Sequence, residues 1–240
     1  MTVTIDVREV SHTYDADTPQ AQLALAEATF RLAEHRVGLI GHNGSGKSTF
    51  VRLVDGLIRP SQGTITVDGL DTVRDGARVR ARTGFLFADP DDQIVMPTVR
   101  EDVTYSLRRD KLGTDEVTAR VDRYLAAFGL SDLGDRPAHL LSGGQKQLLA
   151  LAAVLVREPA LVLMDEPTTL LDLRGERWFA EQVTGLGQTV VLATHRLDLL
   201  TGFDRVLVFD HGRVVADDAP APAIAWYRRR MDGPVGVEAL

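Results

Sequence analysis

The chain of 240 residues is long enough for one compact α/β domain with an inserted subdomain. Its content of 44% hydrophobic and 25% charged residues is that of an average soluble globular protein. The net charge of −7 opposes the broad positive field that duplex nucleic acid or anionic lipid requires, so we expect no nucleic acid partner. The absence of cysteine excludes disulfides, thiolate metal sites and cysteine nucleophiles.

No segment predicts an export signal or a membrane span. The first ten residues, MTVTIDVREV, alternate like a strand and lack a basic-then-apolar signal pattern. The longest apolar run, residues 148–156, reaches about half the length that crosses a bilayer. We therefore expect any work at a membrane to proceed through a partner.

The first third of the chain predicts a small antiparallel sheet and then a strand, a loop and a helix. TVTIDVREV and LALAEATF alternate with period two on either side of the polar turn DADTPQA. RVGLI, residues 36–40, is an apolar strand that leads through GHNGSGKST into the helical spacing of FVRLVDGL. GTITVDG, residues 63–69, is most simply another strand of the antiparallel sheet.

The rest of the chain predicts a helical insertion followed by alternating strands and helices. Residues 83–87 form a strand, and residues 98–157 carry apolar side chains at helical spacing. Strands at 161–165, 189–194 and 205–210 then alternate with the helices RGERWFAEQVTGL and RLDLLTGF, as in a parallel sheet covered on both faces. HGRVV predicts a returning hairpin strand, and the tail after it shows no clear pattern.

The loop between the strand at 36–40 and the following helix predicts a phosphate site. GHNGSGKST satisfies the pattern G-x-x-x-x-G-K-[ST] with Gly41, Gly46, Lys47 and Ser48. Glycines let backbone N–H groups converge on phosphate oxygens, and the helix offers its positive N-terminus. Lys47 would neutralise the β and γ phosphates and the Ser48 hydroxyl would ligate Mg²⁺. The competing interpretation is a loop that is merely tight.

Three polar side chains are expected at the carboxyl edge of the parallel sheet. Asp165 and Glu166 end the strand ALVLMDEP, where carboxylates are costly to bury unless a cation or substrate is present. We assign Asp165 to the Mg²⁺ shell and Glu166 to accept a proton from the attacking water, over a simple helix cap. His195 follows TVVLAT, which favours contact with the γ-phosphate over a structural role.

A second glycine turn, LLSGGQKQ, opens a helix at Ser142. A serine hydroxyl and two glycines at a helix N-terminus can cap the helix or bind a phosphate. Since one phosphate site is already present, the second turn suggests a site for the phosphate of a neighbouring molecule.

Together these motifs resemble the ATP-binding subunit of ABC transporters. GHNGSGKS matches Walker A, LVLMDE Walker B, LSGGQ the signature, TTLLD the D-loop and ATH the switch histidine, in the family's order and over residues 3–215. The resemblance implies a P-loop NTPase (RecA-like) α/β core with an N-terminal antiparallel β subdomain and an inserted α-helical subdomain. We place the ATPase domain at 1–215, its helical subdomain at about 95–157 and a C-terminal tail at 216–240.

The resemblance also implies a head-to-tail dimer in which each ATP lies between one subunit's Walker A and the other's signature. Asp172 would communicate across the dimer, and closure on ATP would drive a transmembrane transport subunit from the cytoplasmic face of the membrane. The dimer partner is a second copy of this chain or a paralogue. Tyr14 would stack on adenine, against the alternative of a surface aromatic. The implied nucleotide contacts are Tyr14, Gly41, His42, Asn43, Gly44, Ser45, Gly46, Lys47, Ser48 and Thr49 in one subunit, and Ser142, Gly143, Gly144 and Gln145 in the other.

Within the family, PDDQIVMPTVREDV is similar to the energy-coupling-factor class of vitamin and metal-ion importers, and FADPDDQI with EPTTLLDLR to its biotin-type ATPase subunits. The chain departs from the family at Ala88, where most members place a glutamine that meets Mg²⁺ and water. Asp89 could reach the metal or cap the turn before Pro90, and we favour the cap. We expect Gln93 to serve coupling to the helical subdomain or the membrane partner and not to bind the metal.

Two other functions remain as alternatives. One is a soluble ABC ATPase of the iron–sulfur assembly type, and the other is a regulatory subunit that binds ATP without cleaving it, which the missing glutamine at Ala88 would suit. In the tail, AWYRRRM predicts a solvated helix end more than a basic foot against lipid or a partner.

Overall fold

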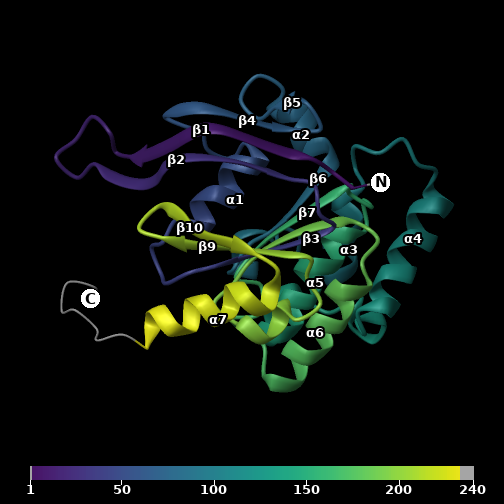
Figure 1. Cartoon of the computed structure of the whole chain (residues 1–240). Coiled ribbons are helices and arrows are strands. Elements are labelled where there is room, and N and C mark those ends of the chain that lie inside the picture. The colour runs from purple at the N-terminus through teal and green to yellow at the C-terminus, as the bar shows by residue number, and fades with distance from the viewer. Residues whose placement is uncertain (1, 233–240) are drawn as a thin grey trace. The chain divides into compact units, whose positions relative to one another are not determined.

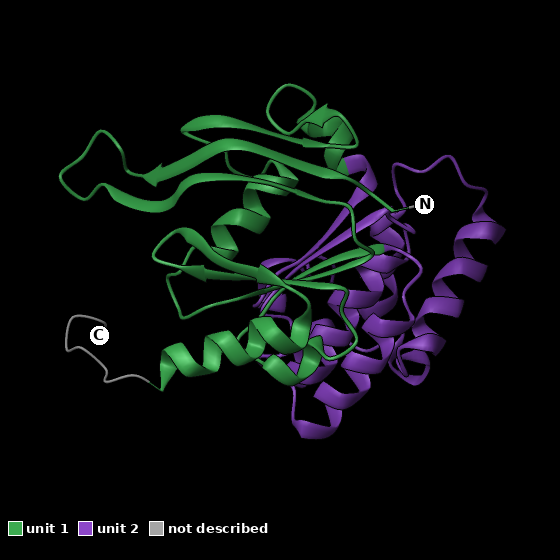
Figure 2. Ribbon diagram, in the orientation of Figure 1, with its two compact units in different colours: residues 1–80, 189–240 green, residues 81–188 purple. Residues whose placement is uncertain are grey.

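A computed structural model describes residues 2–232 of the chain. These residues divide between two compact units, coloured green and purple in Figure 2. The first unit comprises residues 1–80 and 189–240, and the second comprises residues 81–188. The predicted boundaries at 95, 157 and 215 stay predictions, and residues 1 and 233–240 of the predicted domain and tail lie outside the described residues.

The first unit opens with the predicted antiparallel sheet, in the order β2, β1, β4, β5 (Figure 1). Its strands are β1 (Ile5–Tyr14), β2 (Gln22–Leu32), β4 (Gln62–Val67) and β5 (Leu70–Asp71). Alternation buries one face: Ile5, Val7 and Val10 of β1 are at most 1% exposed. β4 pairs antiparallel with β1, as GTITVDG predicted.

Four further strands of the first unit lie in the order β10, β9, β3, β8. They are β3 (Arg36–Ile40), β8 (Thr189–Ala193), β9 (Arg205–Asp210) and β10 (Arg213–Asp218). β3 pairs parallel with both β8 and β9, and β10 returns antiparallel along β9. After their first residues, Arg36 and Thr189, β3 and β8 are apolar because both of their faces are buried. Since the two strands are parallel, their carboxyl ends meet at one edge of the sheet.

Helix α1 (Lys47–Asp55) follows β3, helix α2 (Gly76–Arg82) leads toward the second unit, and helix α7 (Pro220–Met231) ends the described chain. The predicted helix at RLDLLTGF is wrong, since only a 3₁₀ turn forms at Leu197–Leu200. Within the connection between β8 and β9, Gly202 disfavours continuation of the 3₁₀ turn as an α-helix. The tail, which showed no clear pattern, forms α7, and three arginines lie in its last turn.

The second unit contains two parallel strands and four α-helices within residues 81–188. They are β6 (Thr83–Leu86), α3 (Val99–Ser106), α4 (Thr114–Ala127), α5 (Gly143–Leu155), β7 (Leu161–Asp165) and α6 (Leu173–Gly185). A 3₁₀ turn, η1 (Pro90–Asp92), follows β6. The helical spacing predicted within residues 98–157 is present as the three helices α3, α4 and α5. β7 is completely buried and carries its only carboxylate at its last residue.

Candidate functional site

The glycine loop joins β3 to α1 in the first unit. Gly46 is the N-cap of α1 and adopts the left-handed conformation with φ 107°. Among the described residues this helix start has no side-chain cap and no acidic residue in its first turn. The first N–H groups of a helix have no intrahelical acceptor, and the helix dipole favours negative charge there. The loop therefore presents an N-terminus suited to an anion.

Two glycines of this loop leave no space for a larger residue. A Cβ added to Gly41 would lie 2.3 Å from the Phe209 carbonyl oxygen, and one added to Gly46 would lie 2.5 Å from that of Ala24. Both neighbours are backbone atoms, so neither can rotate aside. The glycines at 41 and 46 are thus required for the loop to pack against β2 and β9.

Lys47 is 5% exposed and its ammonium group lies within the loop. Its Nζ donates hydrogen bonds to the carbonyl oxygens of Gly41 at 2.8 Å and His42 at 3.1 Å. The loop therefore encloses its own cation, as a phosphate site requires. The predicted nucleotide contacts from Gly41 to Thr49 all lie in this loop and the first turn of α1.

Tyr14 and His195 approach the same loop from other parts of the first unit. The Tyr14 hydroxyl lies 3.3 Å from Thr49 Oγ1, which brings the end of β1 beside the start of α1. The parallel register pairs Leu39 with Ala193, so the chain leaves β3 at Gly41 and β8 at His195 along the same sheet edge. The His195 side chain is exposed there. Stacking of Tyr14 on adenine stays a prediction.

The other predicted catalytic residues lie in the second unit, at the end of β7. Asp165 is 3% exposed, and Glu166 follows it with φ 47°, a left-handed conformation that is uncommon outside glycine. The Glu166 carbonyl accepts a 2.9 Å hydrogen bond from the Thr169 hydroxyl, which supports this turn. Strained backbone of this kind is common at functional sites.

Beside β7, the end of β6 carries Ala88, the position at which the resemblance led us to expect a glutamine. Leu86 of β6 pairs with Met164 of β7. Ala88 and Glu166 each follow that pair by two residues, so they occupy equivalent positions at the ends of the two strands. A methyl group offers no ligand to a metal. Asp89 acts as the cap that we favoured, because its Oδ1 accepts the Asp91 N–H at 2.9 Å.

Gln93 uses its side chain within the second unit. Its Oε1 accepts the Phe87 N–H at 2.9 Å, and its Nε2 donates to the Ala150 carbonyl at 3.5 Å. The buried Gln147 donates from Nε2 to the Phe87 carbonyl at 3.4 Å. Two glutamines thus hold the backbone at the end of β6 against α5, and sequence reasoning missed Gln147. Its signal was an amide placed directly before the apolar run LLALAAVL of α5.

The segment after Gln93 is fixed by Asp102 of α3. Its Oδ1 accepts the N–H groups of Val95 at 2.8 Å and Met96 at 2.9 Å. Burial raises the pKa of Asp102, and these two hydrogen bonds oppose that rise. The acidic residue of TVREDV therefore orders the turn that leads into α3.

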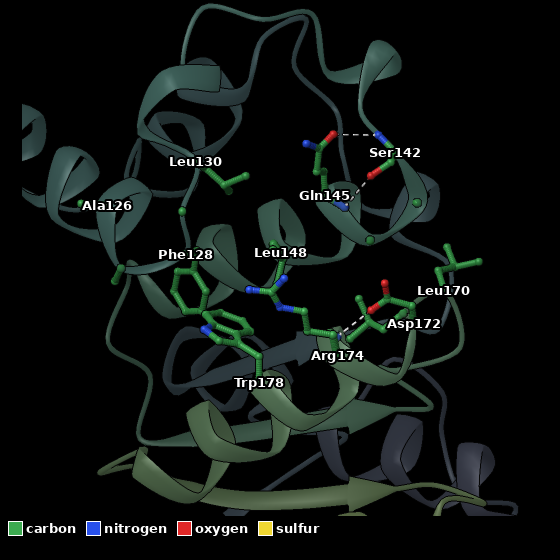
Figure 3. A pocket seen from close by; sticks show the side chains of 16 residues that line it. Ala126, Phe128, Leu130, Ser142, Gln145, Leu148, Leu170, Asp172, Arg174 and Trp178 are labelled. Carbon is green, nitrogen blue, oxygen red and sulfur yellow. Dashed lines mark hydrogen bonds between the residues drawn. The ribbon is translucent and has the colours of Figure 1, made fainter.

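The signature turn and the D-loop line one pocket of about 800 Å³ in the second unit, drawn in Figure 3. Ser142 and Gln145 form a capping box: Ser142 Oγ accepts the Gln145 N–H at 3.3 Å, and Gln145 Oε1 accepts the Ser142 N–H at 3.0 Å. Asp172 caps α6, since its Oδ1 accepts the Gly175 N–H at 2.7 Å. These residues line an open hollow.

Arg174 and Trp178 of α6 also line the pocket, and sequence reasoning did not single them out. Figure 3 shows the Arg174 side chain extending from α6 toward Phe128 and Trp178. The rings of Phe128 and Trp178 meet edge to face at 5.8 Å between centroids. One side of the pocket is therefore aromatic and cationic, and the other consists of the signature glycines.

The profile of the ABC transporter family matches residues 25–169. The chain belongs to this family. It is 49% identical over 96% of its length to a putative ABC transporter ATP-binding protein of Deinococcus radiodurans, all of which is covered. It is 44% identical to the biotin transport ATP-binding protein BioM of Rhizobium etli, with 87% of this chain and 92% of that protein covered. As an ABC ATPase domain, it hydrolyses ATP.

Solved structures agree with this assignment. The protein cbiO1 of Clostridium perfringens, described as part of the ABC transporter complex cbiONQ, matches with a TM-score of 0.80 at 33% identity, covering 96% of this chain and 94% of that one. The cassette MJ0796, a dimer bound to ADP and Pi after hydrolysis, matches with a TM-score of 0.81 at 25% identity over 90% and 98% of the two chains. The predicted fold class is confirmed. No helix among the described residues is long and apolar enough to cross a membrane.

Proposed function

We propose that this chain is the ATP-hydrolysing subunit of an importer of the energy-coupling-factor class. The observation that carries the ATPase function is the uncapped N-terminus of α1 beside the enclosed Lys47 ammonium. The class is supported by relatives named as biotin transport and energy-coupling factor ATP-binding proteins, the latter including EcfA1 of Levilactobacillus brevis at 38% identity. The relatives favour this function over a soluble iron–sulfur assembly ATPase or a purely regulatory subunit.

In the proposed reaction, the loop N–H groups and Lys47 bind the β and γ phosphates of ATP. The Ser48 hydroxyl and the Asp165 carboxylate are hard oxygen donors of the kind that Mg²⁺ prefers, so these two residues would hold it. Bound Mg²⁺ neutralises the charge of the phosphate oxygens. Ala88 contributes no ligand, and neither does Gln93.

The remaining roles belong to Glu166 and His195. Water attacks the γ-phosphorus, its proton passes to the Glu166 carboxylate, and the bond to the β-phosphate oxygen breaks to leave ADP and phosphate. His195 contacts the γ-phosphate at the carboxyl edge of β8. The backbone turn at Glu166 supports an aimed carboxylate, because a left-handed non-glycine residue is kept at some cost.

We further propose that two ATPase subunits act as a head-to-tail pair, either two copies or this chain with a paralogue. The signature residues Ser142 to Gln145 would bind the ATP of the neighbouring subunit, and Asp172 would act across the interface. The dimeric state of the similar cassette supports this arrangement. It also gives the open pocket beside the signature a use that a single subunit lacks.

The pair would act on a transmembrane subunit at the cytoplasmic face of the membrane, and the solute would be a vitamin such as biotin or a transition-metal ion. Both kinds of solute occur in the names of relatives: one is a biotin transport ATP-binding protein of Rhizobium etli, and another is a cobalt import ATP-binding protein of Syntrophus aciditrophicus. The α5–η1 contact, with Lys146 2.7 Å from Asp91, supports transmission between the signature helix and residues 87–93.

Purification of the tagged chain from native membranes in mild detergent, followed by reconstitution into vesicles, tests the proposal. We expect an integral membrane protein to co-purify and the vesicles to take up radiolabelled biotin or Co²⁺ only with ATP. Glu166→Gln should assemble the same complex without uptake. Co-purification with soluble scaffold proteins alone would refute the importer assignment.

A further inference from the structure

Two imidazoles and a carboxylate to which the proposed reaction gives no chemical role lie together in the first unit. His42 comes from the glycine loop, Asp210 is the last residue of β9, and His211 begins the turn to β10. One ligand atom of each, two imidazole nitrogens and one carboxylate oxygen, lie within 4.8 Å of one another. Two imidazoles and a carboxylate form a donor set typical of Zn²⁺ sites.

The ring of His42 is oriented so that its Nε2 faces Asp210. Its Nδ1 lies 2.6 Å from the Asn43 carbonyl oxygen and therefore donates to it. A neutral ring with its proton on Nδ1 has a bare lone pair on Nε2, which lies 3.2 Å from Asp210 Oδ1. Two acceptors at this distance need a proton or a cation between them. A backbone carbonyl that fixes the tautomer is also the usual outer partner of a metal-bound histidine.

Asp210 is oriented in the same way. It is 8% exposed, and its Oδ2 accepts hydrogen bonds from Arg230 of α7 at 2.6 Å and 2.9 Å. Because Oδ2 is hydrogen-bonded to Arg230, Oδ1 is the oxygen that faces the two imidazole rings.

His211 completes the group from an unusual backbone position. It has φ 45°, and Gly212 after it has φ 75°, so the turn between β9 and β10 carries histidine where glycine, asparagine or aspartate is preferred. Its Nε2 lies 3.7 Å from Asp210 Oδ1, and its side chain is 77% exposed. The ring is therefore free to rotate toward an ion.

We propose that His42 Nε2, Asp210 Oδ1 and His211 Nε2 bind one divalent ion of the Zn²⁺ type, with water as the fourth ligand. Ligands each about 2.0 Å from a tetrahedral ion lie roughly 3.3 Å apart. The His42 to Asp210 separation of 3.2 Å already matches. A rotation of the exposed His211 ring would shorten its 3.7 Å separation from Asp210 and its separation from His42 to the same range. The ion would tie the glycine loop to the β9–β10 hairpin and so restrict the motion of the loop that binds nucleotide.

Calorimetric titration of ZnCl₂ into the full chain, free of nucleotide and of any polyhistidine tag and in excess Mg²⁺, tests this site. We expect one ion per chain, with affinity at least tenfold weaker in His211→Ala, since even outer-sphere changes at such sites cost about 10–100-fold. His139→Ala, which removes an exposed histidine of the second unit, is the matched control and should bind zinc as the parent does. Co²⁺ in place of zinc should show the visible absorption of a tetrahedral complex.

Asp210→Asn provides a second variant of the same shape, and it should also weaken zinc binding. No zinc binding by the parent chain, or equal binding by His211→Ala and the parent, would overturn the site. Circular dichroism of each variant distinguishes a lost ligand from a lost fold. Because the readout is zinc affinity, the result does not depend on ATP hydrolysis or transport.

Discussion

At the scale of single residues, Gln93 shows how a departure from a family pattern is accommodated. Its amide bonds to the backbone of Phe87 and Ala150, so it fills a structural position at the end of β6. Ala88 beside it offers no ligand to a metal. Under the proposed mechanism, hydrolysis therefore depends on Asp165, Glu166, His195 and the glycine loop.

Gln93→Ala should lower stability but leave hydrolysis by the isolated chain largely intact. The Phe87 N–H would lose its partner, and an unsatisfied buried donor costs about 1–3 kcal/mol. Urea unfolding and steady-state phosphate release measure the two effects. Glu166→Gln is the comparison, and it should slow hydrolysis by about 10²–10⁴-fold, since it removes the proton acceptor. Equal loss of hydrolysis in both variants would contradict the structural role of Gln93.

Asp55, at the C-terminal end of α1, should make stability depend on pH. Burial raises the pKa of Asp55 from 3.8 to about 7, against the opposing charge of Arg80. The folded chain therefore holds a proton that the unfolded chain releases, so this contribution to the free energy of unfolding is complete below pH 3.8 and is lost as pH rises through about 7. Its size is on the order of 4 kcal/mol.

Asp55→Asn should remove this dependence and raise the free energy of unfolding at pH 8 relative to the parent, with little difference at pH 4. Urea unfolding at both pH values measures it. Asp132→Asn, an exposed aspartate of the second unit, is the control and should follow the parent curve. If the Asp55→Asn and parent curves stay parallel from pH 4 to pH 8, the buried carboxyl does not titrate in this range.

At the scale of elements, α3 and α5 start with the same device but differ in proposed function. Each begins with a capping box, Thr98 with Glu101 and Ser142 with Gln145. Loss of such a cap costs about 0.5–2 kcal/mol. Thr98→Ala and Ser142→Ala should therefore destabilise the second unit to a similar degree.

Only Ser142→Ala should also reduce ATP hydrolysis at saturating chain concentration, because Ser142 is proposed to contact the neighbour's ATP. Phosphate release measured over a range of chain concentrations, beside thermal unfolding of both variants, separates the two effects. A matching loss of hydrolysis in Thr98→Ala would mean that stability, not ATP contact, accounts for both.

Most elements follow from periodicity in the sequence, because burial of one face or both imposes a pattern. The alternation in β1 and β2, the apolar runs of β3 and β7, and the helical spacing of α3 to α5 are of this kind. Two elements do not follow from periodicity. Helix α7 is joined to β9 by the ion pair of Arg230 with Asp210. The 3₁₀ turn at Leu197–Leu200 lies in the short connection between β8 and β9. Such constraints depend on residues far apart in the chain.

At the scale of the whole molecule, ATP should convert Glu166→Gln from monomer to dimer. Hydrolysis would normally separate the pair, so a variant that binds ATP without cleaving it should accumulate in the closed state. Size-exclusion chromatography with light scattering in ATP and in ADP measures this. Lys47→Ala with Glu166→Gln should stay monomeric, because it loses the phosphate contact. A dimer that forms equally in ADP would show that dimerisation does not depend on the γ-phosphate.

The motif sequences located the candidate site, because glycine loops, strand-end carboxylates and the signature turn each have fixed spacing. The sequence did not predict the role of Gln147 or the grouping of His42, Asp210 and His211. These depend on which side chains from separate elements meet, and no periodicity records that. The aromatic and cationic wall of Arg174 and Trp178 was hidden for the same reason.

The hydrogen bonds from Lys47 Nζ to the carbonyls of Gly41 and His42 set a threshold for ligands. Anything entering the loop must replace the carbonyls of Gly41 and His42 with acceptors that are at least as strong. Charged phosphate oxygens exceed that threshold, because charge-assisted hydrogen bonds are roughly twice as strong as neutral ones. Adenosine offers no such acceptor. The competition from these two carbonyls therefore makes the loop selective for the phosphate chain over a nucleoside that lacks it.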